Sequence, residues 1–195
     1  MIFFSVAVLA LEAFLTLLAA GLLVFTVYAT LVGFAMGAPY VRSKKEKIAA
    51  MMALAEISSH DMVVDLGSGD GSLVIAAAAS GAAAAVGVEM NPLLVWYSRM
   101  RIRRARLASR ARIVRGNFFD FPLAGADVVL MYLWPSTVEK LGEKMKQELK
   151  SGARVVSSAF PIAGWMPERI EKNVFVYEID RQHAPSDQWH GTRNE

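Results

Sequence analysis

The sequence contains no cysteine, only three histidines, and no basic residue among its first 38 residues. The lack of cysteine excludes disulfides, thiolate zinc sites and a cysteine nucleophile, and it fits a reducing compartment. His60, His183 and His190 are too scattered along the chain to predict a metal cluster. We therefore expect chemistry that needs neither a resident metal nor a thiol.

The N-terminal segment that lacks basic residues is also long and apolar. Residues 1–38 carry a single charge, Glu12, and residues 13–38 carry none, whereas a membrane-spanning helix needs ~20 apolar residues. The basic start and the small-residue cleavage site of a secretory signal peptide are missing. We predict that residues 1–38 form a retained, single-pass membrane anchor. A buried core helix or an adapted targeting segment is the alternative.

Basic residues begin directly after this segment. Arg42, Lys44, Lys45 and Lys47 follow it, and basic flanks stay on the cytoplasmic side of a membrane. The pattern predicts an outside N-terminus and a domain on the cytoplasmic side, or on the matrix side in an organelle. Residues 39–195 hold all 21 basic and 17 of the 18 acidic residues, a modest excess that favours anionic neighbours.

Helical and strand patterns alternate from residue 44 onward. We predict helices over 44–57, 72–80, 92–108 and 136–149, the first opened by a capping box of Ser43 and Glu46. We predict strands over 62–65, 84–89, 111–115, 128–132, 154–160 and 173–179. The alternation indicates a doubly wound α/β sheet in residues 39–181, ending in two strands with no helix between them. Residues 182–195 lack a hydrophobic pattern and are expected to form a flexible tail.

A glycine loop follows the strand at 62–65. Its pattern is D-x-G-x-G-x-G, from Asp65 to Gly71, and it lacks the G-x-G-x-x-G spacing of a dinucleotide site. Glu89 ends the next strand, about 20 residues on, where an acid can hold two ribose hydroxyls. Together these features predict a nucleoside-type cofactor. A structural glycine turn with two incidental acids is the alternative.

This pattern resembles motif I of the class I S-adenosylmethionine-dependent methyltransferases, which have a Rossmann-like doubly wound sheet. Further segments resemble one group within that class: Pro39-Tyr40-Val41, residues 86–92 (VGVEMNP), residues 132–136 (YLWPS) and residues 152–157 (GARVVS). This group comprises the small membrane-anchored protein-lysine methyltransferases, whose mitochondrial members modify a membrane subunit of ATP synthase and the adenine nucleotide translocase. The resemblance covers roughly residues 39–180.

The resemblance implies a set of residues that bind S-adenosylmethionine. Asp65 and the glycines would line the methionine end, Glu89 would hold the ribose, and Tyr40 would cover the cofactor. The full set is Tyr40, Asp65, Gly67, Ser68, Gly69, Asp70, Gly71, Glu89, Met90, Asn91, Asn117 and Phe118. Asn117 stands where this group commonly has an aspartate that contacts adenine. Its side-chain carbonyl can still accept a hydrogen bond from the adenine amino group.

Methyl transfer to lysine requires an unprotonated amine, and an apolar, aromatic mouth lowers the pKa of a buried amine. Tyr132, Trp134 and Pro135 follow the fourth strand and are our substrate-pocket candidates. Ordinary packing of both aromatic residues in the core is the alternative. The sequence indicates no general base, so the catalytic residues are unknown. The N-P-P-Y signature of amide and adenine methyltransferases is absent, which disfavours nucleic-acid bases as substrates.

Arginines recur at helical spacing after Glu89, namely Arg99, Arg103, Arg106 and Arg110. They form a solvated face, contact anionic lipid headgroups, or bind nucleic acid. Scarce aromatic residues among them make nucleic acid the least favoured partner.

We therefore expect a membrane-anchored methyltransferase that uses S-adenosylmethionine and acts on a lysine of a membrane-associated protein. Confinement to one membrane would raise the effective concentration of such a substrate. Methylation of a lipophilic small molecule and a non-catalytic, cofactor-binding scaffold are the alternatives.

Overall fold

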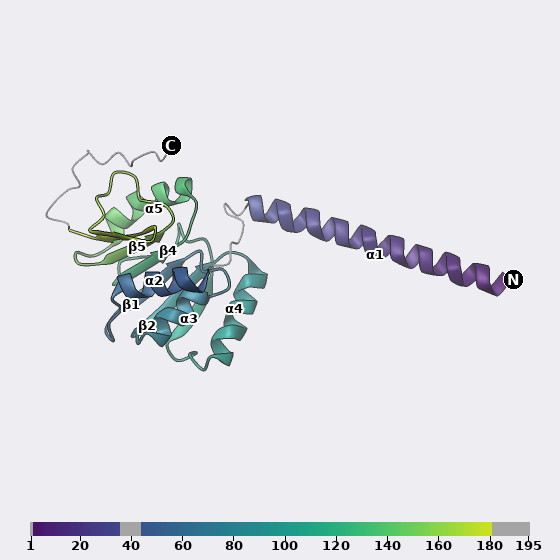
Figure 1. Cartoon of the computed structure of the whole chain (residues 1–195), viewed down its shortest axis with the longest axis horizontal. Helices are drawn as coiled ribbons and strands as arrows, with labels where there is room; N and C mark the ends of the chain where they lie inside the picture. Colours follow the sequence, from purple (N-terminus) through teal and green to yellow (C-terminus); the bar gives the residue numbers. More distant parts are fainter. Residues whose placement is uncertain (1, 36–43, 181–195) are drawn as a thin grey trace. The chain divides into compact units, whose positions relative to one another are not determined.

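The computed structural model of the protein describes residues 2–35 and 44–180, with the side chains of the first helix described for residues 9–27. The chain divides into two compact units, Met1–Tyr40 and Val41–Glu195. Figure 1 shows the long helix of the first unit and the layered α/β arrangement of the second.

The first unit is one helix, α1 (Ile2–Ala35), of 34 residues. At 1.5 Å per residue it is about 50 Å long, more than the ~30 Å of a bilayer core. Its segment Leu9–Val27 is long and apolar enough to cross a membrane, by length and composition alone. The hydroxyls of Thr16 and Thr26 donate to the carbonyls of Glu12 and Leu22, 2.8 and 2.7 Å away, so both polar groups find partners within the helix.

The second unit is built on a seven-stranded sheet of order β3-β2-β1-β4-β5-β7-β6. Strands β1 (Met62–Leu66), β2 (Ala84–Glu89), β3 (Ala111–Arg115), β4 (Val128–Met131) and β5 (Arg154–Ser158) are parallel. Strand β7 (Val174–Glu178) is antiparallel to β5 and pairs on its other side with β6 (Arg169–Glu171). The doubly wound sheet and its antiparallel finish are those that the sequence predicts.

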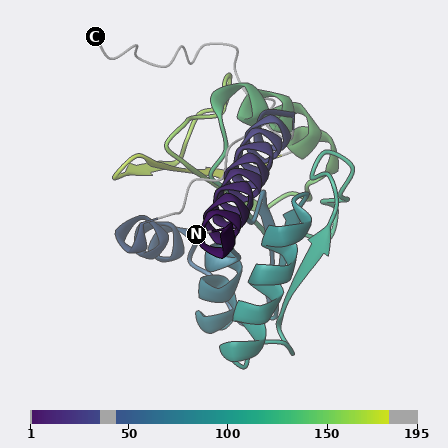
Figure 2. The ribbon, with the colours of Figure 1, turned by 90° about the vertical axis from the view of Figure 1, so that its right-hand side faces the viewer.

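Helices cover both faces of the sheet, and the sheet divides the hydrophobic core into two clusters. Helices α2 (Lys45–Ala55), α3 (Ser72–Ala79) and α4 (Pro92–Arg104) bury their apolar side chains against one face, and α5 (Pro135–Glu148) packs against the other. Figure 2 shows α3 and α4 side by side. Since β1 and β4 are covered on both sides, they are almost wholly apolar, as strands of parallel sheets are.

Helix α2 begins and ends differently from the prediction. Its N-cap is Lys44, whose side chain makes no capping hydrogen bond. The predicted capping box rests on Ser43, which lies outside the described residues. At the other end Glu56 adopts a left-handed φ of 47°. The guanidinium of Arg154 donates to the carbonyls of Ala55 and Glu56, each at 2.7 Å, and so satisfies the helix end.

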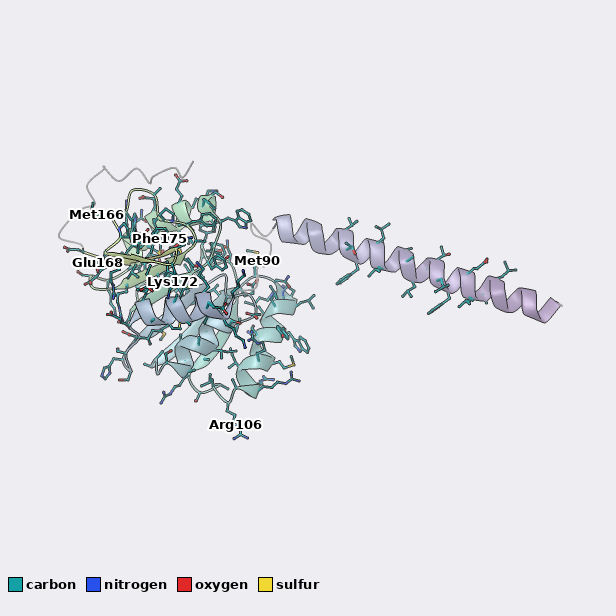
Figure 3. The ribbon with its side chains drawn as sticks, in the orientation of Figure 1. Met90, Arg106, Met166, Glu168, Lys172 and Phe175 are labelled. Atoms are coloured by element: carbon teal, nitrogen blue, oxygen red, sulfur yellow. The ribbon has the colours of Figure 1, made fainter. Side chains whose placement is uncertain are left out.

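Helix α4 ends at Arg104, four residues before the predicted end. Arg106 adopts a left-handed φ of 57°, and the N–H of Leu107 donates to the carbonyl of Ile102, the bond that closes a Schellman motif. The turn brings Leu107 against the same core cluster as Ile102. Arg106 and Arg110 therefore do not continue the helical face of Arg99 and Arg103, and Figure 3 shows Arg106 projecting away from the domain.

Strand β6 was not predicted. It has only three residues, all exposed, and so lacks the apolar alternation that marks a half-buried strand. Strand β5 ends at Ser158, two residues early, because Ala159 turns the chain with a left-handed φ of 74°.

Candidate active site

The glycine loop joins the end of β1 to the start of α3. Gly67, Gly69 and Gly71 all have positive φ (77°, 52° and 74°), which side chains with a Cβ rarely adopt. The N–H groups of Gly67 and Ser68 both donate to the carbonyl of Val88, 3.0 Å away, and bind the loop to the end of β2. The backbone thus stays bare and close to the carboxyl edge of the sheet, where open α/β sheets bind ligands.

Glu89 bridges this loop to the start of α4. One carboxylate oxygen accepts from the N–H of Gly69 and the other from the N–H of Asn91, each at 2.8 Å. The Asn91 side chain in turn accepts from the N–H groups of Leu93 and Leu94 and caps α4. Glu89 therefore stands at the carboxyl edge with a defined orientation and is only half-buried.

Asp65 is the buried acid of the site. It is 2% exposed, and its Oδ2 has no hydrogen-bond partner in the structure. Burial raises the pKa of Asp65 to about 8, and the charges of Glu89 and Asp70 add to the effect. Such an orphaned oxygen, beside a bare glycine loop, fits a ligand that supplies hydrogen-bond donors and positive charge.

Asp70 has a partner within the protein. Its carboxylate lies 2.6 Å from the guanidinium of Arg101, which also donates to the Asp70 carbonyl and the Ser72 hydroxyl. The other carboxylate oxygen of Asp70, Oδ1, accepts a hydrogen bond from the N–H of Ser72 at 3.1 Å. The carboxylate that was predicted to bind cofactor is thus engaged in tying the loop to α4. The expectation of a cofactor contact through Asp70 stays a prediction.

Residues that follow β3 and β4 also lie close to the glycine loop. A Cβ added to Gly67 would lie 2.7 Å from Cδ2 of Leu133 and 3.9 Å from Cε1 of Phe118. Gly67 is therefore required by its φ, whereas the Leu133 methyl group could shift to admit a Cβ. Asn117 accepts from the N–H of Phe119 through its side-chain carbonyl, in a turn that follows β3.

Trp134 and Pro135 begin α5 at the end of β4, as N-cap and first helical residue. The Trp134 ring stacks on Phe160, with centroids 6.3 Å apart and an interplanar angle of 20°, yet Trp134 stays 48% exposed. It is therefore not an ordinary core aromatic residue. Tyr132 is half-buried.

Phe160 was missed by the sequence reasoning. It follows β5, whose last residues turn back so that the Ser157 hydroxyl donates to the Phe160 carbonyl at 2.6 Å. An aromatic residue directly after a parallel strand would have indicated a site residue. Because the predicted strand runs through residue 160, Phe160 was assigned to the strand instead. Of the other predicted site residues, Met90 is half-buried beside Glu89, and Tyr40 lies outside the described residues.

The arrangement has a negative pole and an aromatic pole at one edge of the sheet. Asp65 and Glu89 supply acids around the bare loop, while Leu133, Trp134 and Phe160 follow β4 and β5. The residues that the structure describes include no group of three ligand-type side chains placed to hold a metal ion. This sheet, with its D-x-G-x-G-x-G loop and the acid Glu89 at the end of β2, defines a class I methyltransferase that uses S-adenosylmethionine.

Comparison with known proteins gives the particular family. Residues 65–169 match the model of the ANTKMT methyltransferase domain, and the chain belongs to this family. It is 40% identical over 135 residues to a protein-lysine N-methyltransferase of Saccharolobus islandicus strain REY15A, covering 69% of this chain and 84% of that protein. It is 35% identical over 170 residues to the adenine nucleotide translocase lysine N-methyltransferase of Mus musculus, covering 82% and 74%.

A second lysine N-methyltransferase of Mus musculus, named for an ATP synthase subunit, is 36% identical over 140 residues, but the match spans 68% of this chain and only 56% of that relative. Among solved structures, an RNA methyltransferase from Salinibacter ruber in complex with S-adenosyl-L-homocysteine superposes with a TM-score of 0.71 at 32% identity, over 76% of this chain and all of that one. The predicted fold class, enzyme class and cofactor are thereby confirmed.

Proposed function

We propose that the protein is a membrane-anchored methyltransferase that modifies a lysine side chain of a membrane-associated protein. The observation that carries methyl transfer is the bare glycine loop beside Asp65, whose buried Oδ2 has no partner. The lysine part is supported by the activities for which the relatives from Saccharolobus islandicus and mouse are named, all of them lysine methylation.

In this proposal each residue of the negative pole holds one part of the cofactor. S-adenosylmethionine supplies an activated methyl group on a sulfonium. Asp65 and the backbone of Gly67, Ser68, Gly69, Asp70 and Gly71 bind its methionine end, and Glu89, with Met90 and Asn91 beside it, binds the ribose. Asn117 and Phe118 border the adenine, and Tyr40 covers the cofactor. The charge of Glu89 favours a cationic ligand, and such a ligand would in turn favour the charged form of Asp65.

The aromatic pole receives the lysine. In-line displacement needs a neutral amine aligned with the methyl group and shielded from water. Tyr132, Trp134 and Pro135, joined by Phe160, would surround the side chain with apolar surface and lower the pKa of its amine. We propose Trp134 as the first contact, because its stacked ring is held in place and yet exposed.

The membrane part rests on α1. Its segment Leu9–Val27 has the length and composition of a span, and the basic residues that follow it favour a domain on the cytoplasmic or matrix side. The bilayer is thus a partner besides the protein substrate. Anionic headgroups are expected to attract the exposed arginines Arg99, Arg103, Arg106 and Arg110.

A labelling experiment tests the lysine proposal. The full chain is incubated with membranes and radiolabelled S-adenosylmethionine, and label is then measured in protein, lipid extract and RNA. We expect label on protein, stable to base and recovered as methyl-lysine after hydrolysis. Label confined to the lipid extract or to RNA would overturn the lysine assignment, the latter in favour of the activity named for the Salinibacter ruber neighbour.

Matched variants locate the activity. Trp134→Ala is expected to lower the rate of protein methylation at least tenfold while cofactor affinity stays within twofold, because the aromatic pole contacts substrate only. Glu148→Gln is the control, since Glu148 lies at the other end of α5 from Trp134, where it accepts the N–H of Leu123. Equal losses in both variants would contradict a substrate role for Trp134.

A further inference from the structure

The outer face of α4 is apolar at its start and basic at its end. The helix buries Val95, Ser98 and Ile102 against the sheet. The opposite face carries, at helical spacing, Leu93, Trp96, Met100, Arg103 and Arg104. Leu93 and Trp96 are 65% and 64% exposed, among the largest exposed apolar side chains of the second unit. Leu93 and Trp96, three residues apart on the helix, form a small exposed apolar patch.

A groove lies beside this face, between α4 and the end of β3. It has a volume of about 500 Å³, and side chains of α4 form most of its lining, with Arg115 at the end of β3 completing it. We call it the α4 groove; Pro92, Val95, Trp96 and Met100 form its apolar walls, and Arg99, Arg103, Arg104 and Arg115 its basic ones. Guanidinium groups thus stand beside an indole and a thioether within one depression.

The segment that lines the groove carries charge of one sign. Residues 92–115 contain eight of the 21 basic residues and none of the 18 acidic ones, so the rest of the chain is acidic on balance. Arg101 is turned inward to Asp70, and Arg99 donates twice to the carbonyl of Ile113. In the part of the chain that the structure describes, no ion pair holds Arg103, Arg104 or Arg115.

We propose that the α4 groove binds the phosphate headgroups of an anionic bilayer, with Leu93 and Trp96 entering the interface. Guanidinium groups bind phosphate in a bidentate manner, and tryptophan is favoured at the boundary between headgroups and acyl chains. The proposal rests on the membrane attachment proposed for α1, which would keep such a surface close to this domain. A nucleic acid would use the arginines and could stack on Trp96, but it would gain little from Leu93 and half-buried Met100.

This contact would also orient the active site. Helix α4 begins three residues after Glu89 and is capped by Asn91, whose backbone N–H binds the Glu89 carboxylate. The apolar end of the outer face, at Leu93 and Trp96, is therefore the end next to the carboxyl edge of the sheet. A domain lying on headgroups through this face would therefore have the start of α4, beside Glu89, at the bilayer surface.

The absence of cysteine permits a direct test. Leu93→Cys in the full chain is reconstituted into nanodiscs of phosphatidylcholine alone or with about 30% phosphatidylserine, and the rate of maleimide labelling is measured. We expect labelling to be at least fivefold slower in the anionic nanodiscs. Protection should disappear in about 0.5 M salt, where charges are screened. Glu139→Cys, exposed on α5 at the other face of the sheet, should label equally in both.

A second set of variants assigns the effect to the arginines. Leu93→Cys combined with Arg103→Glu and Arg104→Glu should label at the neutral-lipid rate in anionic nanodiscs, whereas Lys140→Glu and Lys144→Glu on α5 should keep the protection. Equal labelling in both lipids, or protection by an RNA oligonucleotide and not by phosphatidylserine, would overturn the proposal. Methyl transfer is measured on the same samples, so a protein that methylates lysine without lipid protection refutes only this inference.

Discussion

Asp65 gives the site its pH dependence, because its carboxyl is buried between Glu89 and Asp70 and its Oδ2 has no partner. Its pKa is about 8 in the folded protein and 3.8 in the unfolded chain. Between these values the folded state holds a proton that the unfolded state has released, so stability falls as pH rises toward 8. The loss is at most about 1.4 kcal/mol per pH unit.

We predict that Asp65→Asn removes this dependence. Thermal unfolding of the ligand-free chain in detergent, followed between pH 5.5 and 8.5, should show a falling Tm for the wild type and a flatter profile for the variant. The variant should be the more stable protein at pH 8.5 while its affinity for S-adenosylmethionine is at least tenfold weaker. Parallel profiles for both proteins would show that Asp65 does not titrate in this range.

Gly71 is the residue of the loop where both conformation and space exclude a side chain. Its φ is 74°, and an added Cβ would lie 2.9 Å from the Cβ of Ser98 on α4. Gly71→Ala is expected to lower the free energy of unfolding by about 1–3 kcal/mol beyond the cost of backbone strain, since α3 and α4 must move apart. Gly81→Ala is the control, because Gly81 also has a positive φ, of 101°, but nothing within 4 Å.

Chemical denaturation would measure both glycine variants, together with cofactor titration. Gly71→Ala should weaken cofactor binding and Gly81→Ala should not. If the two variants lose the same stability and keep the same affinity, the contact between Gly71 and Ser98 is not what requires glycine.

At the scale of elements, the ion pair of Arg101 and Asp70 connects α4 to the glycine loop. The side chains are 26% and 7% exposed, and the Arg101 guanidinium also lies 5.8 Å from the ring centroid of Tyr97. Arg101→Met leaves the Asp70 carboxylate buried without its partner, which costs about 3 kcal/mol. Lys146→Met, which breaks the exposed pair with Glu143, should cost under about 1 kcal/mol.

Urea unfolding of both variants checks this prediction. Arg101→Met should also raise the dissociation constant of S-adenosylmethionine, because the loop loses its tie to α4. A stability change no larger than that of Lys146→Met would show that the pair adds nothing beyond a surface contact.

Element by element, the sequence predicted what depends on continuous apolar runs. The five parallel strands and the helices between them were placed within a few residues, since buried strands and amphipathic helices carry their own periodicity. The end of α4 was not, because Leu107 is drawn into the core by a turn at Arg106 that no local signal marks. Strand β6 pairs with its neighbour β7 across a turn at Lys172 and Asn173, but its three exposed residues carry no apolar alternation. The position of Phe160 depends on the turn at Ala159 that ends β5.

At the scale of the whole molecule, α1 is the part whose role is open to a simple test. We predict that the full chain stays in the membrane pellet after carbonate extraction. Leu15→Lys together with Leu18→Lys should release much of it, because each charge at the centre of a span costs about 3 kcal/mol. The double alanine variant at the same positions should stay in the pellet, and wild-type protein in the supernatant would contradict an integral anchor.

The sequence by itself determined the class of fold, the cofactor loop and the apolar N-terminal helix, because glycine spacing, strand alternation and uncharged length are local properties of the chain. Only the tertiary structure decided which of the acids has a partner within the protein. It left Asp65 without a partner and paired Asp70 with Arg101, 31 residues away. It also stacked Phe160 on Trp134 and ended α4 so that its outer face joins Trp96 to Arg103 and Arg104. These depend on which strand ends and helix faces meet in space, and spacing along the chain does not encode that.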